Sequence, residues 1–463
     1  YPADVAVYGK RIMAVGDVSD YVGPSSQLVD ASGQYLAPGM IDGHIHVECS
    51  KLSVTMFAQA VVPFGTTSVV SGLDQIYVVA GLKGVREFLD EAKRTPLKIF
   101  WGAPFRTPYT IPSSTVGHYF GPREHRTSQK WPECVGVWET EKNFVLSGDR
   151  SSMAAIGIAS KNRLPVLGCA PMTTGRLLSS FINAGIRADH ECYSREEVRE
   201  KLRNGLYVML RESSVAHFLK DQIRIVAENK IDAGRIGFCA DDVTASDILR
   251  EGHLDRLVRM TTEEGVDPIR AIQMATINCA EIYRIDELVG SISPGRIADI
   301  LIVDDPERFN VKKVIANGKV VAAETKMLQD HRPPPKNRGL LRSFRVSKVR
   351  PKEIQVRTRE KWKRVRALSM VMSDLVPFVR RRREVVLDVE DGVLFPDVEQ
   401  DVLYVTCVER YGRTKHRPVA FISGFELRQG AMASSNSPDD NNILCIGANT
   451  DDIAFAVNRI IKA

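Results

Sequence analysis

Between residues 40 and 241 the chain alternates eight short β-rich runs with helical segments, and this rhythm restricts the fold more than any other feature. The helical segments have recognisable starts and periodicity, such as the capping box Ser194-Arg195-Glu196-Glu197 over 194–204 and the amphipathic stretch Val85–Lys93. Eight such units in about 250 residues have the length of a (β/α)₈ TIM barrel, with a doubly wound open sheet as the structural alternative. The predicted strands are 40–47, 66–72, 98–104, 135–139, 165–170, 186–190, 207–212 and 236–241.

Two histidines two residues apart lie at the end of the first predicted strand, in Gly43-His44-Ile45-His46-Val47. Side chains at positions i and i+2 of a strand lie on one face, so both imidazoles are expected to point at one metal ion. A lone buried histidine is more often an ordinary core residue. This pair at a strand end, after Pro38-Gly39, favours a metal site.

Three later strands also end in side chains that bind metals. The fourth ends in Glu139, the sixth in His190 and the eighth in Asp241, although Asp241 alone is also typical of a cap for a helix over 244–252. The C-terminal ends of these strands surround one centre only in a closed barrel, which favours the barrel over the open sheet. Nitrogen and oxygen ligands of this kind suit Zn, Mn or Fe, and we expect one or two divalent ions.

This set of ligands indicates metal-assisted hydrolysis. A bound divalent ion lowers the pKa of its water from 15.7 towards about 7, which makes a metal-bound hydroxide available to attack an sp² carbon. Asp241 and Glu139 are the expected catalytic carboxylates, with Asp241 passing the proton to the leaving group. No GxGxxG sequence follows a predicted strand, which argues against a dinucleotide-dependent oxidoreductase.

Segments on both sides of the barrel predict a small β-domain. Residues 3–16 have the pattern of a hairpin about Gly9-Lys10, and β-structure returns over 290–321, where Asn317-Gly318 indicates a type I′ turn. In the remaining C-terminal region we predict strands near 384–389, 402–408 and 418–423 and a final helix from about Asp451. The predicted domains are a small β-sandwich from 1–38 and 289–330, a hydrolase barrel over 39–288, and a C-terminal α/β domain over 331–463.

The composition of the chain restricts the kinds of partner that it can bind. The 463 residues are 44% hydrophobic and 26% charged, and no apolar run is long enough to span a bilayer, so we expect a small-molecule substrate and no membrane partner. The eight cysteines are scattered without a CxxC pair, which favours a reducing cytoplasm.

Residues 333–383 carry 17 Lys and Arg against 3 Asp and Glu. A solvated face or an intersubunit contact in a homo-oligomer is favoured there over nucleic-acid binding.

Several longer stretches follow the pattern of one known family. They are Pro38-Gly-Met-Ile-Asp-Gly-His-Ile-His46, His46-Val-Glu-Cys-Ser50, Ala188-Asp-His-Glu-Cys192, Tyr207-Val-Met-Leu-Arg-Glu-Ser213, Phe238-Cys-Ala-Asp-Asp242, Leu249-Arg-Glu-Gly-His-Leu-Asp-Arg256, Ala271-Ile-Gln-Met-Ala-Thr-Ile-Asn278 and Ala454-Phe-Ala-Val-Asn-Arg459. Over essentially its whole length the chain resembles the adenine deaminase family of the amidohydrolase superfamily. The resemblance implies a metal-dependent hydrolase of C–N bonds that releases ammonia from a nitrogen heterocycle. It places metal ligands at His44, His46, a bridging Glu139, His190 and Asp241.

Three positions depart from that family's pattern. The strand-five histidine is here Cys169, which we include among the expected metal ligands because a thiolate binds zinc. The His-Glu pair after strand two is Asp74-Gln75, and a histidine-containing turn near the C-terminus is Ser434–Asn442. The expected substrate-binding residues are Asp74, Gln75, Arg106 and Glu191.

These departures leave a second enzymatic hypothesis open, an amide, lactam or lactone hydrolase that acts on a different cyclic substrate. A third hypothesis is a non-catalytic protein whose basic segment 333–383 binds an anion or nucleic acid. The retained ligand set argues against it. The chain starts at Tyr1 without a methionine and stops at Ala463, short of the usual end of the family, so we expect a truncated chain or a shorter branch.

Overall fold

In the computed structural model of the protein, eight strands pair in parallel in the order in which they occur along the chain. Each predicted strand overlaps an observed one, and the predicted barrel fold is confirmed. The strands are buried along almost their whole length, as expected for parallel strands covered by helices. They are β4 (Met40–Asp42), β5 (Thr66–Ser71), β6 (Lys98–Pro104), β7 (Cys134–Glu141), β8 (Val166–Cys169), β9 (Ala188–Asp189), β10 (Tyr207–Arg211) and β11 (Ile236–Cys239).

The sheet closes into a barrel through the residues just after β4. The backbone N–H of Asp241 donates to the carbonyl of His44 at 2.9 Å, and the N–H of His46 donates to the carbonyl of Asp241 at 3.1 Å. Between them, Ile45 forms a parallel bridge with Asp241. The prediction that the first strand continues to residue 47 is therefore wrong, because the chain bends after Asp42 to reach the end of β11.

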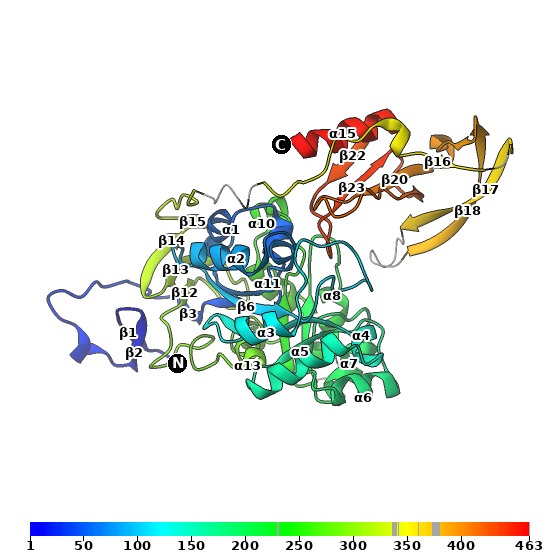
Figure 1. The fold of residues 1–463 in the computed structure, drawn as a ribbon. Helices are drawn as coiled ribbons and strands as arrows, with labels where there is room; N and C mark the ends of the chain where they lie inside the picture. The colour runs from blue at the N-terminus through cyan, green and yellow to red at the C-terminus, as the bar shows by residue number, and fades with distance from the viewer. Residues whose placement is uncertain (229–230, 336–339, 341, 360, 373–379, 463) are drawn as a thin grey trace. The chain divides into compact units, whose positions relative to one another are not determined.

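Helices follow the strands and form a layer around them (Figure 1). Helix α7 begins where predicted, since the Ser194 side chain accepts a hydrogen bond from the N–H of Glu197. Thr244 and not Asp241 caps helix α10, so the interpretation of Asp241 as a helix cap is wrong. The helices are α1 (Val54–Val61), α2 (Asp74–Ala92), α3 (Pro122–Ser128), α4 (Lys142–Leu146), α5 (Arg150–Lys161), α6 (Gly175–Asn183), α7 (Arg195–Arg203), α8 (Leu219–Gln222), α9 (Arg224–Ala227), α10 (Ala245–Glu251), α11 (Leu254–Glu263), α12 (Pro268–Met274) and α13 (Ile277–Tyr283).

Two small sheets complete this part of the chain. Strands β1 (Asp4–Tyr8) and β2 (Arg11–Gly16) form the hairpin expected about Gly9-Lys10. The other sheet has the order β15-β14-β13-β12-β3, and β3 pairs with β12, so segments before and after the barrel share one sheet. Asn317 and Gly318 have φ values of 51° and 77°, as a type I′ turn requires. The strands of this sheet are β3 (Tyr35–Pro38), β12 (Ile300–Val303), β13 (Val311–Ala316), β14 (Lys319–Ala323) and β15 (Lys326–Met327).

The structure describes residues 1–462 except 229–230, 336–339, 341, 360 and 373–379. The contacts divide the chain into two units. Unit 1 comprises Tyr1–Asp74, Leu82–Tyr109 and Phe120–Pro335, and unit 2 comprises Gln75–Gly81, Thr110–Tyr119 and Lys336–Ala463. The predicted domain boundaries stay predictions. Within the described residues, no helix is both long and apolar enough to cross a bilayer.

Unit 2 contains a mixed sheet with the order β16-β19-β18-β17-β21-β20-β23-β22 and the helix α15 (Thr450–Lys462). The three predicted strands correspond to β18, β20 and β21, and α15 begins where expected. Ile453 and Val457 of α15 pack in one core with Tyr404 and Phe421 of the sheet. The strands are β16 (Val356–Arg357), β17 (Arg364–Met372), β18 (Arg380–Glu390), β19 (Val393–Leu394), β20 (Leu403–Val408), β21 (Val419–Ser423), β22 (Ala431–Ser434) and β23 (Ile443–Gly447).

Two segments that follow barrel strands β5 and β6 belong to unit 2. The Asn441 side-chain amide donates to the carbonyl of Gln75 at 2.8 Å, and the N–H of Thr110 donates to the Asp439 carboxylate at 2.6 Å. No pattern in the sequence predicted this assignment. The turn Ser434–Asn442, where the family has a histidine, therefore provides contacts that hold both segments in unit 2.

Gly39 joins β3 to β4 in a close contact. A Cβ atom at this position would lie 2.2 Å from Thr67 Oγ1 and 2.9 Å from the Cβ of Asp299. We predict that Gly39→Ala lowers the free energy of unfolding by about 1–3 kcal/mol, because the barrel cannot accept the extra methyl without a backbone shift.

The matched control is Gly157→Ala within α5, where an added Cβ would meet nothing within 4 Å. This change should raise the free energy of unfolding by about 0.5–1 kcal/mol, because alanine is the better helix former. Urea denaturation measures both variants. A Gly39→Ala protein as stable as the unchanged chain would contradict the close packing at this junction.

Candidate active site

Four strand ends in unit 1 direct ionisable side chains at one point. His44 Nε2 lies 3.3 Å and His46 Nε2 lies 3.2 Å from Glu139 Oε1. Asp241 Oδ1 lies 3.5 Å from His46 Nε2. His190 Nε2 lies 3.7 Å from Glu139 Oε1 and 3.8 Å from Asp241 Oδ2. All five side chains are buried, so the structure brings together the five residues that the family resemblance named as ligands.

Backbone irregularities aim the two carboxylates. The register of β7 against β8 shifts between Val137 and Thr140, which places Glu139 on a bulge with a φ of 54°. Asp241, directly after β11, has a φ of 56°. Left-handed φ values in residues other than glycine carry strain of about 1–3 kcal/mol and cluster at active sites. Bulges re-aim side chains in the same way, and this one turns Glu139 towards the histidines.

Trp138 lies on the same bulge and supports the histidine rings. Its ring stacks on His44 at a centroid distance of 3.7 Å, and His44 stacks in turn on His190 at 3.6 Å. The indole N–H donates to Asp74 Oδ2 at 3.1 Å, and the same oxygen lies 3.5 Å from His46 Nδ1. Trp138 therefore supports His44 directly by stacking, His190 through His44, and His46 through Asp74. No sequence pattern indicated this role for Trp138.

Cys169 and His190 lie on neighbouring strand ends. With Glu139 they offer three ligand atoms within 4.8 Å of one another. The Nδ1 atom of His190 lies 3.1 Å from the carbonyl of Gly168, which turns Nε2 towards the cluster. Burial raises the pKa of the Cys169 thiol well above its usual value, and Glu139 and Glu191 raise it further. A thiolate at this position therefore requires a neighbouring cation.

The pKa values of the ionisable groups in the cluster are shifted in opposite directions. Burial alone would raise the pKa of Glu139, but His190, His44 and His46 outweigh it and hold this pKa well below the usual value. Burial raises the pKa of Asp241 well above its usual value in spite of Arg211. Burial also lowers the pKa of both His44 and His190, whereas Glu139 and Asp241 outweigh burial at His46 and raise its pKa well above the usual value.

The donor set fits a divalent cation. Both ring nitrogens of His44 and Nδ1 of His46 are buried without a hydrogen-bond partner among the described residues. Buried polar atoms normally have a partner, and a metal ion would supply one for the atoms that face the cluster. Imidazole nitrogens and carboxylate oxygens are the ligands that such an ion takes in catalytic sites.

Arg211, the last residue of β10, places a positive charge beside the carboxylates of the cluster. Its Nη1 lies 2.8 Å from Asp241 Oδ2, its Nη2 lies 3.1 Å from Asp242 Oδ2, and it also pairs with Glu191. The side chain is buried and orients Asp241. Sequence reasoning did not select Arg211, although a charged residue that ends an apolar strand was the feature that had identified Glu139.

Comparison with known proteins assigns the chain to a family. A sequence model of the Amidohydrolase family matches residues 35–321, and one of the Adenine deaminase C-terminal domain matches residues 378–463. Adenine deaminase 4 of Rhizobium meliloti is 56% identical over 462 residues, which are 100% of this chain and 77% of that protein. Adenine deaminase 1 of Desulfotalea psychrophila is 50% identical over 100% of this chain and 78% of its own length. The chain belongs to the adenine deaminase family. It is a hydrolytic enzyme, and the hypothesis of a non-catalytic binding protein is wrong.

Solved structures share the fold of this family member. β-Aspartyl dipeptidase from Fervidobacterium islandicum AW-1 matches with a TM-score of 0.53 over 71% of this chain and 94% of that chain, at 19% identity. N-acetylglucosamine-6-phosphate deacetylase from Pasteurella multocida matches with a TM-score of 0.51 over 69% and 95%, at 15% identity. At these identities the likeness supports the barrel fold alone.

The predicted substrate-binding residues of this adenine deaminase family member have different surroundings. Glu191 and Asp74 border the cluster, with Glu191 Oε1 3.9 Å from His190 Nε2. Arg106 stacks its guanidinium group over the ring of Phe144 at 4.0 Å. Gln75 belongs to unit 2.

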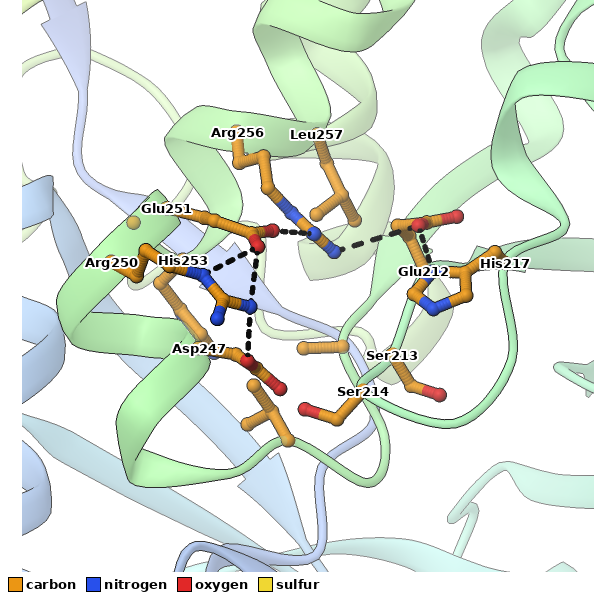
Figure 2. Close-up of a pocket in the computed structure, with 13 residues that line it drawn as sticks. Glu212, Ser213, Ser214, His217, Asp247, Arg250, Glu251, His253, Arg256 and Leu257 are labelled. Carbon is orange, nitrogen blue, oxygen red and sulfur yellow. Dashed lines mark hydrogen bonds and ion pairs between the residues drawn. The ribbon is translucent and has the colours of Figure 1, made fainter.

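A polar pocket lies beside the ends of β10 and β11 (Figure 2). Arg250 pairs with Asp247 at 2.7 Å and with Glu251 at 2.8 Å. Glu212 lies 2.7 Å from His217 Nδ1 and 3.6 Å from Arg256. Arg250 is thus paired with two carboxylates in this pocket, whereas His253 Nε2, which also lines it, is buried without a hydrogen-bond partner among the described residues.

The role of Trp138 can be tested against a second buried tryptophan. Trp101 donates its indole N–H to the carbonyl of Gly72 at 2.7 Å. Trp138→Phe and Trp101→Phe each remove one such bond, at about 1 kcal/mol of stability. Only Trp138→Phe also releases Asp74, and we predict that it alone lowers zinc affinity by about tenfold, the typical effect of losing a group that supports a ligand. Competition with a chelator measures both affinities. Equal zinc affinities in the two variants would contradict the support of the histidines by Trp138.

Proposed function

We propose that this enzyme hydrolytically deaminates adenine and releases ammonia. The observation that carries the proposal is the buried cluster of His44, His46, Glu139, His190 and Asp241, in a chain 45–56% identical to three proteins named adenine deaminase. These names favour adenine over the amide, lactam and lactone substrates that Cys169 and Asp74 had left open.

The metal ligands are assigned to two positions. His44, His46 and Asp241 would hold one divalent ion and Cys169 and His190 a second, with Glu139 within reach of both sets. Two groups of ligand atoms within 4.8 Å of one another support this division, His44 with His46 and Glu139, and Glu139 with Cys169 and His190. A third group joins His190 to His44 and Asp241, so His190 also borders the first position. A divalent ion bound there would lower the pKa of a coordinated water towards about 7. Zinc is the proposed metal, since a thiolate in the ligand set favours zinc over manganese.

Asp241 is the proposed proton carrier. A carboxylate at this position can accept a proton from a coordinated water and pass it on. Arg211 holds Oδ2 at 2.8 Å, while Oδ1 lies 3.5 Å from His46 Nε2 and faces the cluster. The proton would be taken up at Oδ1 and passed to the amino group that leaves the ring. Glu139, with its depressed pKa, stays ionised throughout.

Glu191 and Asp74 are the proposed contacts to the substrate ring, which is supported by their positions at the border of the cluster. The roles of Gln75 and Arg106 stay predictions. We also propose a cytoplasmic location, supported by eight cysteines that are all free thiols. Assembly into a homo-oligomer stays a prediction.

The proton-carrier role predicts the effect of Asp241→Asn. This variant should fold normally and lower the turnover of adenine by about 10²-fold or more, the scale of a lost general acid and base. The control is Asp221→Asn, at an exposed residue paired with Arg195, which should keep full turnover. Ammonia release measures both. Unchanged turnover in Asp241→Asn would remove Asp241 from the mechanism, and faster turnover of a cyclic amide than of adenine would reject adenine as the substrate.

The thiolate ligand predicts a spectroscopic difference. In protein loaded with Co²⁺, the unchanged chain should show the charge-transfer absorption of a thiolate bound to cobalt, and Cys169→Ser should lack it because an alcohol forms no such bond. Cys407→Ser in unit 2 serves as the control and should keep the band. A spectrum unaffected by Cys169→Ser would exclude this thiol from the ligand set.

A further inference from the structure

Unit 1 contains a lysine with no exposed surface. Lys201 lies on α7 and its side chain is 0% exposed. Its ammonium group donates to the carbonyls of Ala170 and Glu191 at 2.8 Å each and to Glu197 Oε1 at 2.7 Å. Asp189 Oδ2 lies 3.3 Å away. Lysine is almost never fully buried unless it is paired, and Lys201 pairs with Glu197 and Asp189.

The charge of Lys201 is maintained in this surrounding. Burial alone would lower its pKa, but Asp189 and Glu197 outweigh burial and raise it above the usual value. An ammonium group has three N–H donors, and three oxygen acceptors lie within 2.8 Å. The ammonium group is therefore charged, and each of its three N–H donors has an oxygen acceptor.

The two carbonyl groups that Lys201 binds stand next to proposed metal ligands. Ala170 directly follows Cys169, and Glu191 directly follows His190. The β8–β9 ladder ends before both ligands, since its last residue pair is Gly168 with Asp189. Strand β9 is only two residues long. Beyond that point, Lys201 joins the two strand ends where the backbone ladder does not.

The carboxylates around Lys201 also bind the backbone that follows the two proposed ligands. Asp189 Oδ1 accepts hydrogen bonds from the N–H of Glu191 at 2.8 Å and of Ala170 at 3.4 Å. Glu197 accepts from the N–H groups of Met172 and Tyr193 at 2.9 Å each. The chain after both ligands is thus fixed to one buried ion-pair network centred on Lys201.

We propose that Lys201 is a positioning residue that sets the spacing of Cys169 and His190 and thereby the affinity of the second metal position. The inference rests on the proposed function, in which these two residues are ligands. Lys201 acts through the backbone next to the ligands and through Asp189 and Glu197, so it orders the site without binding the metal.

The test is zinc binding by the full chain, measured by chelator competition that resolves a first and a second ion. Lys201→Met keeps a long side chain but loses the charge and the donors. The affinity for the second ion should fall by about tenfold or more, the usual effect of losing a group that orients ligands. The affinity for the first ion should stay within about twofold of that of the unchanged chain. The proposal is overturned if the folded variant loses affinity for both ions equally, or if it keeps the affinity of the unchanged chain for both.

Two controls separate positioning from general stability. Lys161→Met, at an exposed lysine at the end of α5, should change neither ion. Val314→Ala, at a buried residue of β13, should lower the melting temperature without selective loss of the second ion. Selective loss of the second ion in Val314→Ala would show that any destabilised chain loses it, which would also overturn the proposal.

A further variant covers the case in which Lys201→Met does not fold. Lys201→Arg keeps the charge but replaces a compact ammonium with a planar fork that does not reproduce the same three bonds. It should fold and still bind the second ion more weakly than the unchanged chain. Wild-type affinity for both ions in folded Lys201→Arg would count against the positioning role.

The ligand assignment is checked in the same titration. Cys169→Ser and His190→Ala should each weaken the second ion. If neither does, the assignment of these ligands is wrong whatever Lys201 does. If both do and Lys201→Met does not, only the positioning role of Lys201 is rejected.

Discussion

Closure of the barrel between residues 43–46 and 238–241 is the constraint on which the rest of the site depends. The hydrogen bonds that join His44 and His46 to the backbone of Asp241 complete the ring of strands. They also place the three side chains proposed as the first set of ligands beside one another. Asp42 reinforces this seam, since its carboxylate accepts hydrogen bonds from the N–H groups of His44 at 3.1 Å and Ala240 at 3.2 Å. The hydrogen bonds that close the barrel are therefore also the ones that position the proposed ligands. A change that breaks the pairing of residues 43–46 with 238–241 would also separate these ligands.

The concentration of buried carboxylates around this seam requires compensating positive charge. Glu139, Asp241 and Glu191 all lie within 4 Å of His190 Nε2 in a region shielded from water. An unpaired charge in such surroundings is very unfavourable, whereas a paired one with good geometry is tolerated. Arg211 supplies one cation at the cluster, Lys201 supplies another behind β8 and β9, and a divalent metal fits the remainder. The opposite pKa shifts of Glu139 and Asp241 follow from this arrangement, because histidines surround the first and burial dominates at the second.

Two of the departures from the family pattern expected from the sequence, Cys169 and Asp74, lie beside the proposed metal ligands. Cys169 occupies the end of β8, where a histidine is usual, and keeps a ligand atom near Glu139 and His190. Asp74 takes the place of another histidine and is held by the indole of Trp138. Cys169 is the last residue of β8, whereas Asp74 is the first residue of α2. Changes at such positions are the usual way in which one barrel accommodates variation at its C-terminal edge.

The sequence by itself determined the barrel, the number of its strands and the identity of five clustered side chains, because these depend on local features. Alternating apolar runs and helix starts are visible within a window of a few residues, and His44, His46, Glu139, His190 and Asp241 all lie at or just beyond the ends of such runs. What only the tertiary structure decided depends on contacts between distant segments. The bend after Asp42, the bulge that turns Trp138 and Glu139 inwards, and the assignment of residues 75–81 and 110–119 to unit 2 all arise where one part of the chain meets another. Arg211 and Lys201 illustrate the same limit, because an ordinary charged residue in the sequence acquires a role only when folding buries it among particular partners.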